Sequence, residues 1–123
     1  MNKMIKMAAI AVGAAAMFAG CGAKTPDAVA LDALKTCQAG KVTPEFLAKN
    51  FTTEMANNMS KDITMLNETM AARMKGETYT VVDTKINGDT AVVKIKAERG
   101  KENSTNDVSL ILVDGVWKIN KDH

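Results

Sequence analysis

Few side chains in this chain of 123 residues have the types and spacing that catalysis or metal binding requires. The single histidine, His123, is the last residue, where chains are seldom held in place, so we expect no positioned imidazole for acid–base work or for zinc. Asp83, with Tyr79 on the same face of a predicted strand, is the one acid to test as a base. A solvated pair between Asp83 and Lys118 explains that position equally well. No phosphate loop or calcium loop is present, and we expect no catalytic residues, no metal and no cofactor.

Cys21 is the next reactive side chain, and it follows an apolar leader. Lys3 and Lys6 make the start of the chain positive, and the apolar stretch 7–19 has about 13 residues, the length of a signal-peptide core. A membrane-spanning helix needs about 20 apolar residues, so the leader is too short for a permanent span. The sequence therefore predicts an exported protein.

The residues Phe18-Ala19-Gly20-Cys21 resemble a lipobox, the signal of bacterial lipoproteins, although the first position is usually leucine. The resemblance implies a signal peptide over residues 1–20, removed before a cysteine whose sulfur is acylated with palmitate-like chains. Residues 21–25 then form the lipidated cysteine and a short tether. Because glycine rather than aspartate follows Cys21, the resemblance also implies attachment to the periplasmic leaflet of the outer membrane.

Cys37 has two alternative fates. If Cys21 carries a lipid, Cys37 is a single thiol, which we expect on the buried side of a helix. If the leader is instead cut elsewhere, for instance after Ala23, the two cysteines could form a disulfide. These alternatives exclude each other and stay open.

The charge of the chain argues against a polyanionic partner. Lysine and arginine number 16 and aspartate and glutamate 14, and two of the lysines lie in the leader, so the mature chain carries 14 charges of each sign. With no basic stripe, we expect no nucleic-acid partner. The remaining length suits one small domain over residues 26–120, followed by a tail at 121–123.

Helix signals fill the first half of this domain. Thr25-Pro26-Asp27 begins a helix over 26–39 that Gly40 ends, and Thr43-Pro44-Glu45 begins a second over 44–50. A third helix is predicted over 54–75. One side of it is an apolar stripe that we expect to pack on a sheet, made of Met55, Met59, Ile63, Leu66, Met70 and Met74.

From Thr78 the hydrophobic period changes to two, and turn signals divide four strands at about 78–86, 89–99, 104–113 and 116–120. Paired as a meander, the strands place three rows of side chains on one face, which the helices should cover. The rows are Val82, Val93, Leu110 and Ile119; Thr84, Ala91, Leu112 and Trp117; and Thr80, Ile95 and Val108.

The opposite face of the sheet carries an apolar band of Val92, Ile111, Val113 and Val116. A contiguous exposed band is typical of a partner surface, although plain exposure is the alternative. A second candidate site is a small pocket between the methionine stripe and Trp117, with Met70 on its wall.

Helices followed by a meander that closes with Asp114-Gly115-Val116-Trp117-Lys118-Ile119 are similar to small exported lipoproteins of the nuclear transport factor 2-like (cystatin-like) superfamily, many of unknown function. The Thr-Pro helix start and the run Gly88–Val93 support the resemblance. It implies an α+β fold with three N-terminal helices packed on one face of a curled four-stranded antiparallel sheet, and often a dimer.

We therefore expect an envelope lipoprotein, held at the membrane by its lipid, whose non-catalytic domain binds a protein partner or itself. The alternatives are binding of a small apolar ligand in the cone or, less favoured, a lyase-like or isomerase-like enzyme that uses Asp83.

Overall fold

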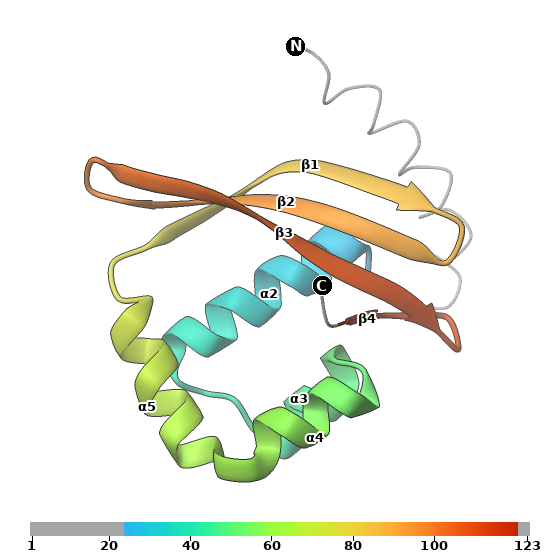
Figure 1. The fold of residues 1–123 in the computed structure, drawn as a ribbon, viewed down its shortest axis with the longest axis horizontal. Coiled ribbons are helices and arrows are strands. Elements are labelled where there is room, and N and C mark those ends of the chain that lie inside the picture. The colour runs from blue at the N-terminus through green and yellow to red at the C-terminus, as the bar shows by residue number, and fades with distance from the viewer. Residues whose placement is uncertain (1–23, 121–123) are drawn as a thin grey trace.

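The computed structural model describes residues 24–120, and within them four α-helices and a 3-10 turn precede a four-stranded antiparallel sheet. The elements are α2 (Pro26–Ala39), α3 (Pro44–Asn50), α4 (Thr53–Met59), η1 (Ser60–Asp62), α5 (Ile63–Arg73), β1 (Thr78–Asn87), β2 (Thr90–Arg99), β3 (Glu102–Val113) and β4 (Val116–Ile119). Figure 1 shows the helices on one side of a sheet whose strands lie in the order β1-β2-β3-β4. The predicted α+β fold, with helices on one face of a curled meander, is confirmed.

The first two helices begin and end as their sequences predict. Proline occupies the first turn of both α2 and α3, and the Thr43 hydroxyl accepts a hydrogen bond from the Phe46 N–H at 3.1 Å. Gly40 ends α2 with φ +69°, a left-handed conformation that glycine adopts without a steric penalty. Its N–H donates to the Cys37 carbonyl, which closes the last turn.

The third predicted helix is wrong as a single rod, because η1 separates α4 from α5. At the break, the Asp62 carboxylate accepts from the Met65 N–H at 3.0 Å and starts α5 afresh, while the Ser60 hydroxyl donates to the Asn57 carbonyl. Short polar side chains of this kind compete with the helix for its own backbone groups. All six residues of the apolar stripe nevertheless pack against the core or belong to it, as predicted.

The register of the sheet differs from the prediction at two of the three strand pairs. Leu110 pairs with Ile119 and Leu112 with Trp117, as predicted. Val93, however, pairs with Val108 and Thr84 instead of Leu110 and Val82, a shift of two residues at each pair. The cause is the turns: the first lies at Gly88–Asp89, one residue later than expected, and the second, Gly100–Lys101, has two residues, so that β3 begins at Glu102 rather than at 104.

A bulge in β1 between Val81 and Asp83 also corrects the predicted inner face. An extra residue in one strand reverses the facing of every side chain before it. Val82, predicted in the core, is therefore 48% exposed, and Thr80 is exposed as well. Val81 and Tyr79 pack against the core in their place.

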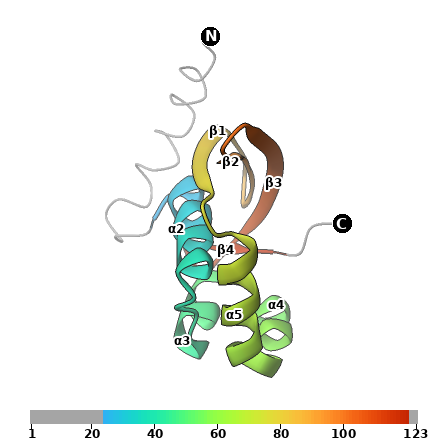
Figure 2. The same ribbon diagram turned by 90° about the vertical axis from the view of Figure 1, so that its left-hand side faces the viewer.

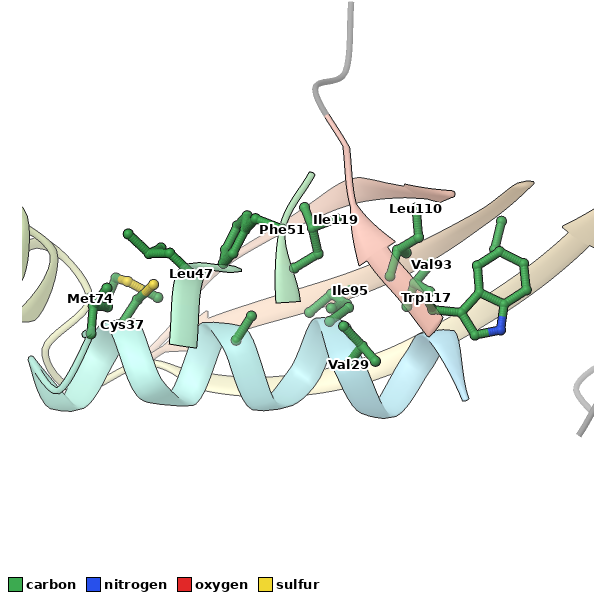
Figure 3. Packing of buried hydrophobic residues seen from close by; sticks show 14 residues of the cluster. Val29, Cys37, Leu47, Phe51, Met74, Val93, Ile95, Leu110, Trp117 and Ile119 are labelled. Carbon is green, nitrogen blue, oxygen red and sulfur yellow. The ribbon is translucent and has the colours of Figure 1, made fainter. Parts of the chain in front are cut away.

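The core lies between α2 and the inner face of the sheet. Figure 3 shows Val29 of α2 pointing toward the strands, with Val93 and Leu110 above it and Trp117 at one end. The turned view in Figure 2 shows α2 beneath the curl of β1, β2 and β3, with the other helices farther from the sheet. The remaining buried apolar residues are Ala30, Ala33, Cys37, Val42, Leu47, Phe51, Met74, Ala91, Ile95 and Ile119.

Candidate ligand-binding groove

A groove of about 850 Å³ runs between α2, α3 and the turn that joins β3 to β4. Sites for small molecules in proteins usually measure about 300–1,000 Å³, so the groove is large enough for a ligand. Its lining residues are Lys24, Val29, Asp32, Lys35, Thr36, Ala39, Lys41, Glu45, Phe46, Lys49, Asn50, Asp114, Gly115, Val116 and Trp117.

The bottom of the groove is apolar. Trp117 and Val29, which are 1% and 3% exposed, belong to the core and present only their edges to it. Half-buried Phe46 forms part of the α3 wall and packs edge to face against Phe51, with ring centroids 6.0 Å apart. Val116, next to the β3–β4 turn, borders the groove at its other end. The groove can therefore take an apolar group.

The rim of the groove is charged. Lys24 and Asp32 form a salt bridge of 2.6 Å near the start of α2. Among the described residues, Lys35, Lys41 and Lys49 form no salt bridge. Two acids, Glu45 and Asp114, are also on the rim. Because these lysines come from α2, the following loop and α3, their gathering was not apparent as a run of charge in the sequence.

Two sets of hydrogen bonds fix the α3 wall. The Asn67 side chain on α5 accepts from the Val42 N–H at 2.8 Å and donates to the Val42 carbonyl at 3.0 Å, which holds the loop before α3. On the other side, the Lys118 ammonium donates to the Ala48 carbonyl at 2.7 Å. The position of α3 thus depends on contacts from α5 and β4, far away in sequence.

Of the two residues that the sequence predicted on the wall of one pocket, Trp117 and Met70, only one lines this groove. Trp117 lines the groove, whereas Met70 does not and instead packs against the core from α5. The groove is bounded by α2, α3 and the β3–β4 turn, and no residue of α5 lines it. The signals that could have indicated it are Phe46 and Lys49 on one side of α3, but a seven-residue helix gives little periodicity to read.

The predicted partner surface lies on the outer face of the sheet. Val92, Val113 and Val116 are 38%, 37% and 40% exposed, and Val113 is directly opposite Val116. Ile111 is half-buried between Thr90 and Lys118. The four residues share the face as predicted, and Val82 near the β1 bulge is a further exposed valine.

Asp83 and Tyr79 do not share a face, so the expected pair is wrong. The bulge leaves Asp83 opposite exposed Lys94, while Tyr79 packs toward the core and its hydroxyl donates to the Glu77 carboxylate at 2.7 Å. Burial, and then this hydrogen bond, raise the pKa of the Tyr79 hydroxyl far above its ordinary range. Arg99 lies 3.4 Å from Glu77 and also donates to the Arg73 carbonyl, so the cluster joins the end of α5 to the sheet.

Cys37 is a free thiol buried in the core, and burial raises its pKa. A buried thiol with a raised pKa is a poor nucleophile. Cys21, the predicted lipidation site, lies outside the described residues, as do the predicted signal peptide and the tail. Within residues 24–120, no cluster of three metal-binding side chains occurs and no helix is long and apolar enough to cross a bilayer.

Comparison with known proteins supports the fold. No protein-family model and no curated protein sequence matches the chain. A proposed NTF2-like transpeptidase from Campylobacter jejuni has a similar structure, with a TM-score of 0.59 and 19% identity over 80% of this chain and 100% of that one. A SEC-C motif containing protein from Rhodopseudomonas palustris is similar over 78% of this chain and 75% of its own, with a TM-score of 0.54 and 13% identity. The chain therefore has the NTF2-like fold, and identities this low carry the likeness no further.

Proposed function

We propose that this protein is a lipid-anchored lipoprotein of the bacterial cell envelope whose domain is a non-catalytic binding module, and that the groove between α2 and α3 is its ligand site. The observation that carries the proposal is a concave surface lined by apolar side chains, with lysines on its rim that form no salt bridge among the described residues. Such a surface suits an amphipathic molecule, with the apolar part against Trp117 and Phe46 and an anionic group near Lys35 or Lys49.

The place of the groove relative to the anchor supports a lipid-like ligand. Lys24 is on the groove wall, and only two residues separate it from Cys21. Three steps along an extended chain span at most about 10.5 Å. A lipid on Cys21 would therefore hold the groove beside the bilayer surface, where amphipathic molecules are concentrated.

The test uses Trp117, the only tryptophan of the chain, as a fluorescent reporter within the groove. A long-chain fatty acid should change its emission in a saturable way and raise the melting temperature, and the uncharged methyl ester should bind more weakly. Ala39→Phe, an exposed helix position on the groove, should fill the site and abolish the response. Ala72→Phe, exposed on α5 outside the groove, and Met70→Ala are matched controls that should bind as the parent does.

If no amphiphile changes the emission, or if Ala39→Phe and Ala72→Phe respond alike, the groove is not the site. Membrane attachment is tested separately, by an intact-mass measurement on the exported protein. An acylated Cys21 at the new N-terminus supports the anchor, whereas a bare sulfur or a bond to Cys37 contradicts it.

A second candidate is a protein partner bound on the outer face of the sheet, favoured by the three exposed valines Val92, Val113 and Val116. Ile111→Asp should then leave folding intact and remove a co-purifying protein, whereas Lys85→Asp, on the same face at the β1 edge, should not. Unchanged association in the Ile111 variant would contradict this surface.

A further inference from the structure

The start of the described chain lies against the groove. The Lys24 ammonium is 2.6 Å from the carboxylate of Asp32, although Asp32 is six residues, or about 9 Å of rise, beyond Pro26 at the start of α2. The lysine side chain therefore runs back along α2, on the side of the helix that lines the groove. Figure 3 shows Trp117 beside the same end of α2. A group attached just before Lys24 can thus reach the groove and its tryptophan.

The predicted lipid on Cys21 is a group of this kind. Only Gly22 and Ala23 separate Cys21 from Lys24. The Cα atoms of Cys21 and Lys24 are therefore at most about 10.5 Å apart. Neither intervening residue has a large side chain, and glycine turns the backbone without a steric penalty. The tether can therefore direct the lipid toward the groove.

We propose that, when the protein is away from a bilayer, one acyl chain on Cys21 lies in the groove of its own molecule. The inference rests on the proposed function, because it needs both the lipid and a groove that takes apolar chains. The groove measures about 850 Å³ and presents Val29, Phe46 and Trp117 to the acyl chain. Sites that hold small molecules usually measure about 300–1,000 Å³.

The charges of the groove distinguish this internal ligand from a free fatty acid. Lys24 and Asp32 neutralise each other at the end where the lipid would enter, and a thioether-linked lipid brings no anionic group. Its acyl chain needs only the apolar lining. A free fatty acid also needs a cation, which Lys35 or Lys49 supplies, since neither forms a salt bridge among the described residues.

The tether decides when the acyl chain occupies the groove. A short flexible linker gives an attached group an effective concentration on the order of millimolar, so in water the lipid of the same molecule is favoured over a dilute free ligand. A groove leaves one side of an acyl chain in water, whereas a bilayer removes the whole chain from water. The acyl chain should therefore leave the groove at a membrane, and the groove is then available to a free ligand.

Brominated lipid provides the test, because bromine quenches tryptophan emission on contact and Trp117 is the only tryptophan. Exporting cells grown on a brominated fatty acid would attach brominated chains to Cys21. The purified lipoprotein should then emit less light in detergent-free buffer than after transfer to an excess of unbrominated phosphatidylcholine vesicles. Dilution with an excess of unbrominated lipoprotein should leave the quenching unchanged, since each acyl chain lies in its own groove.

Three variants locate the acyl chain. Ala39→Phe, which fills the groove, should abolish the quenching in buffer, whereas Ala72→Phe on α5 should be quenched as the parent is. Lys49→Gln should weaken the binding of a free fatty acid and leave the quenching by the attached lipid intact.

The inference is overturned if emission is equal in buffer and in vesicles, or if Ala39→Phe and Ala72→Phe are quenched alike. It is also overturned if unbrominated lipoprotein relieves the quenching, because the acyl chain then comes from another copy. None of these results contradicts the groove as a ligand site, which binding of a free fatty acid to Cys21→Ser, a chain without the lipid, tests by itself. An unmodified Cys21 in the intact mass overturns both the anchor and this inference.

Discussion

Replacement of Asn67 should show how strongly the α2–α3 corner depends on one side chain. In Asn67→Ala, the buried N–H and C=O of Val42 lose both of their partners, at 2.8 and 3.0 Å. A hydrogen bond contributes about 0.5–1.5 kcal/mol, and an orphaned buried group costs about 1–3 kcal/mol. Some relief comes from water at this partly buried site, so we expect a loss of about 2–3 kcal/mol, against a total stability of about 5–15 kcal/mol.

The assay is equilibrium unfolding in urea, with the slope m unchanged and the midpoint lowered. The melting temperature should fall by roughly 10–20 °C, since about 4–8 °C corresponds to each kcal/mol in a domain of this size. Asn58→Ala, an exposed asparagine on α4, is the control and should shift stability by less than about 0.5 kcal/mol. If Asn67→Ala and Asn58→Ala are equally stable, the corner does not depend on these two hydrogen bonds.

Three further predictions follow from the core and the sheet. Arg99→Ala removes the donor to the Arg73 carbonyl at the end of α5. Because the arginine is half exposed, we expect the free energy of unfolding in urea to fall by only about 0.5–1 kcal/mol. A variant as stable as the parent would contradict this. The folded state holds the Tyr79 proton more tightly than the unfolded state, so stability that is complete below the ordinary pKa of 10.0 should decline as the pH rises above it. That decline should be weaker in Tyr79→Phe, and identical pH profiles in urea unfolding would refute it. In a Cys21→Ser variant, a thiol reagent should label Cys37 slowly in the folded protein and rapidly in urea, with the labelling followed by mass spectrometry. Rapid labelling of the folded protein would show that the Cys37 thiol is accessible.

Local signals in the sequence determined the elements and the layers. Proline after threonine fixed the starts of α2 and α3, and glycine in a left-handed conformation fixed the end of α2. The change of hydrophobic period near Thr78 predicted the sheet, and the alternation within β2 correctly placed Ala91, Val93 and Ile95 inside. These features depend on residues close together in the chain, where the physical rules are short-ranged.

The tertiary structure alone decided the register, the bulge and the groove. A shift of two residues keeps the same side chains on the same face, so the hydrophobic pattern could not distinguish the observed register from the predicted one. The bulge beside Val82 and the break at Asp62 reflect pairing and capping that hydrophobic periodicity does not encode. The groove could not be predicted because its walls come from segments as far apart in the sequence as Lys24 and Trp117. Their approach depends on contacts such as those of Asn67 and Lys118. Sequence patterns specify which face of an element is buried, but the packing of distant elements decides where a concave surface is left between them.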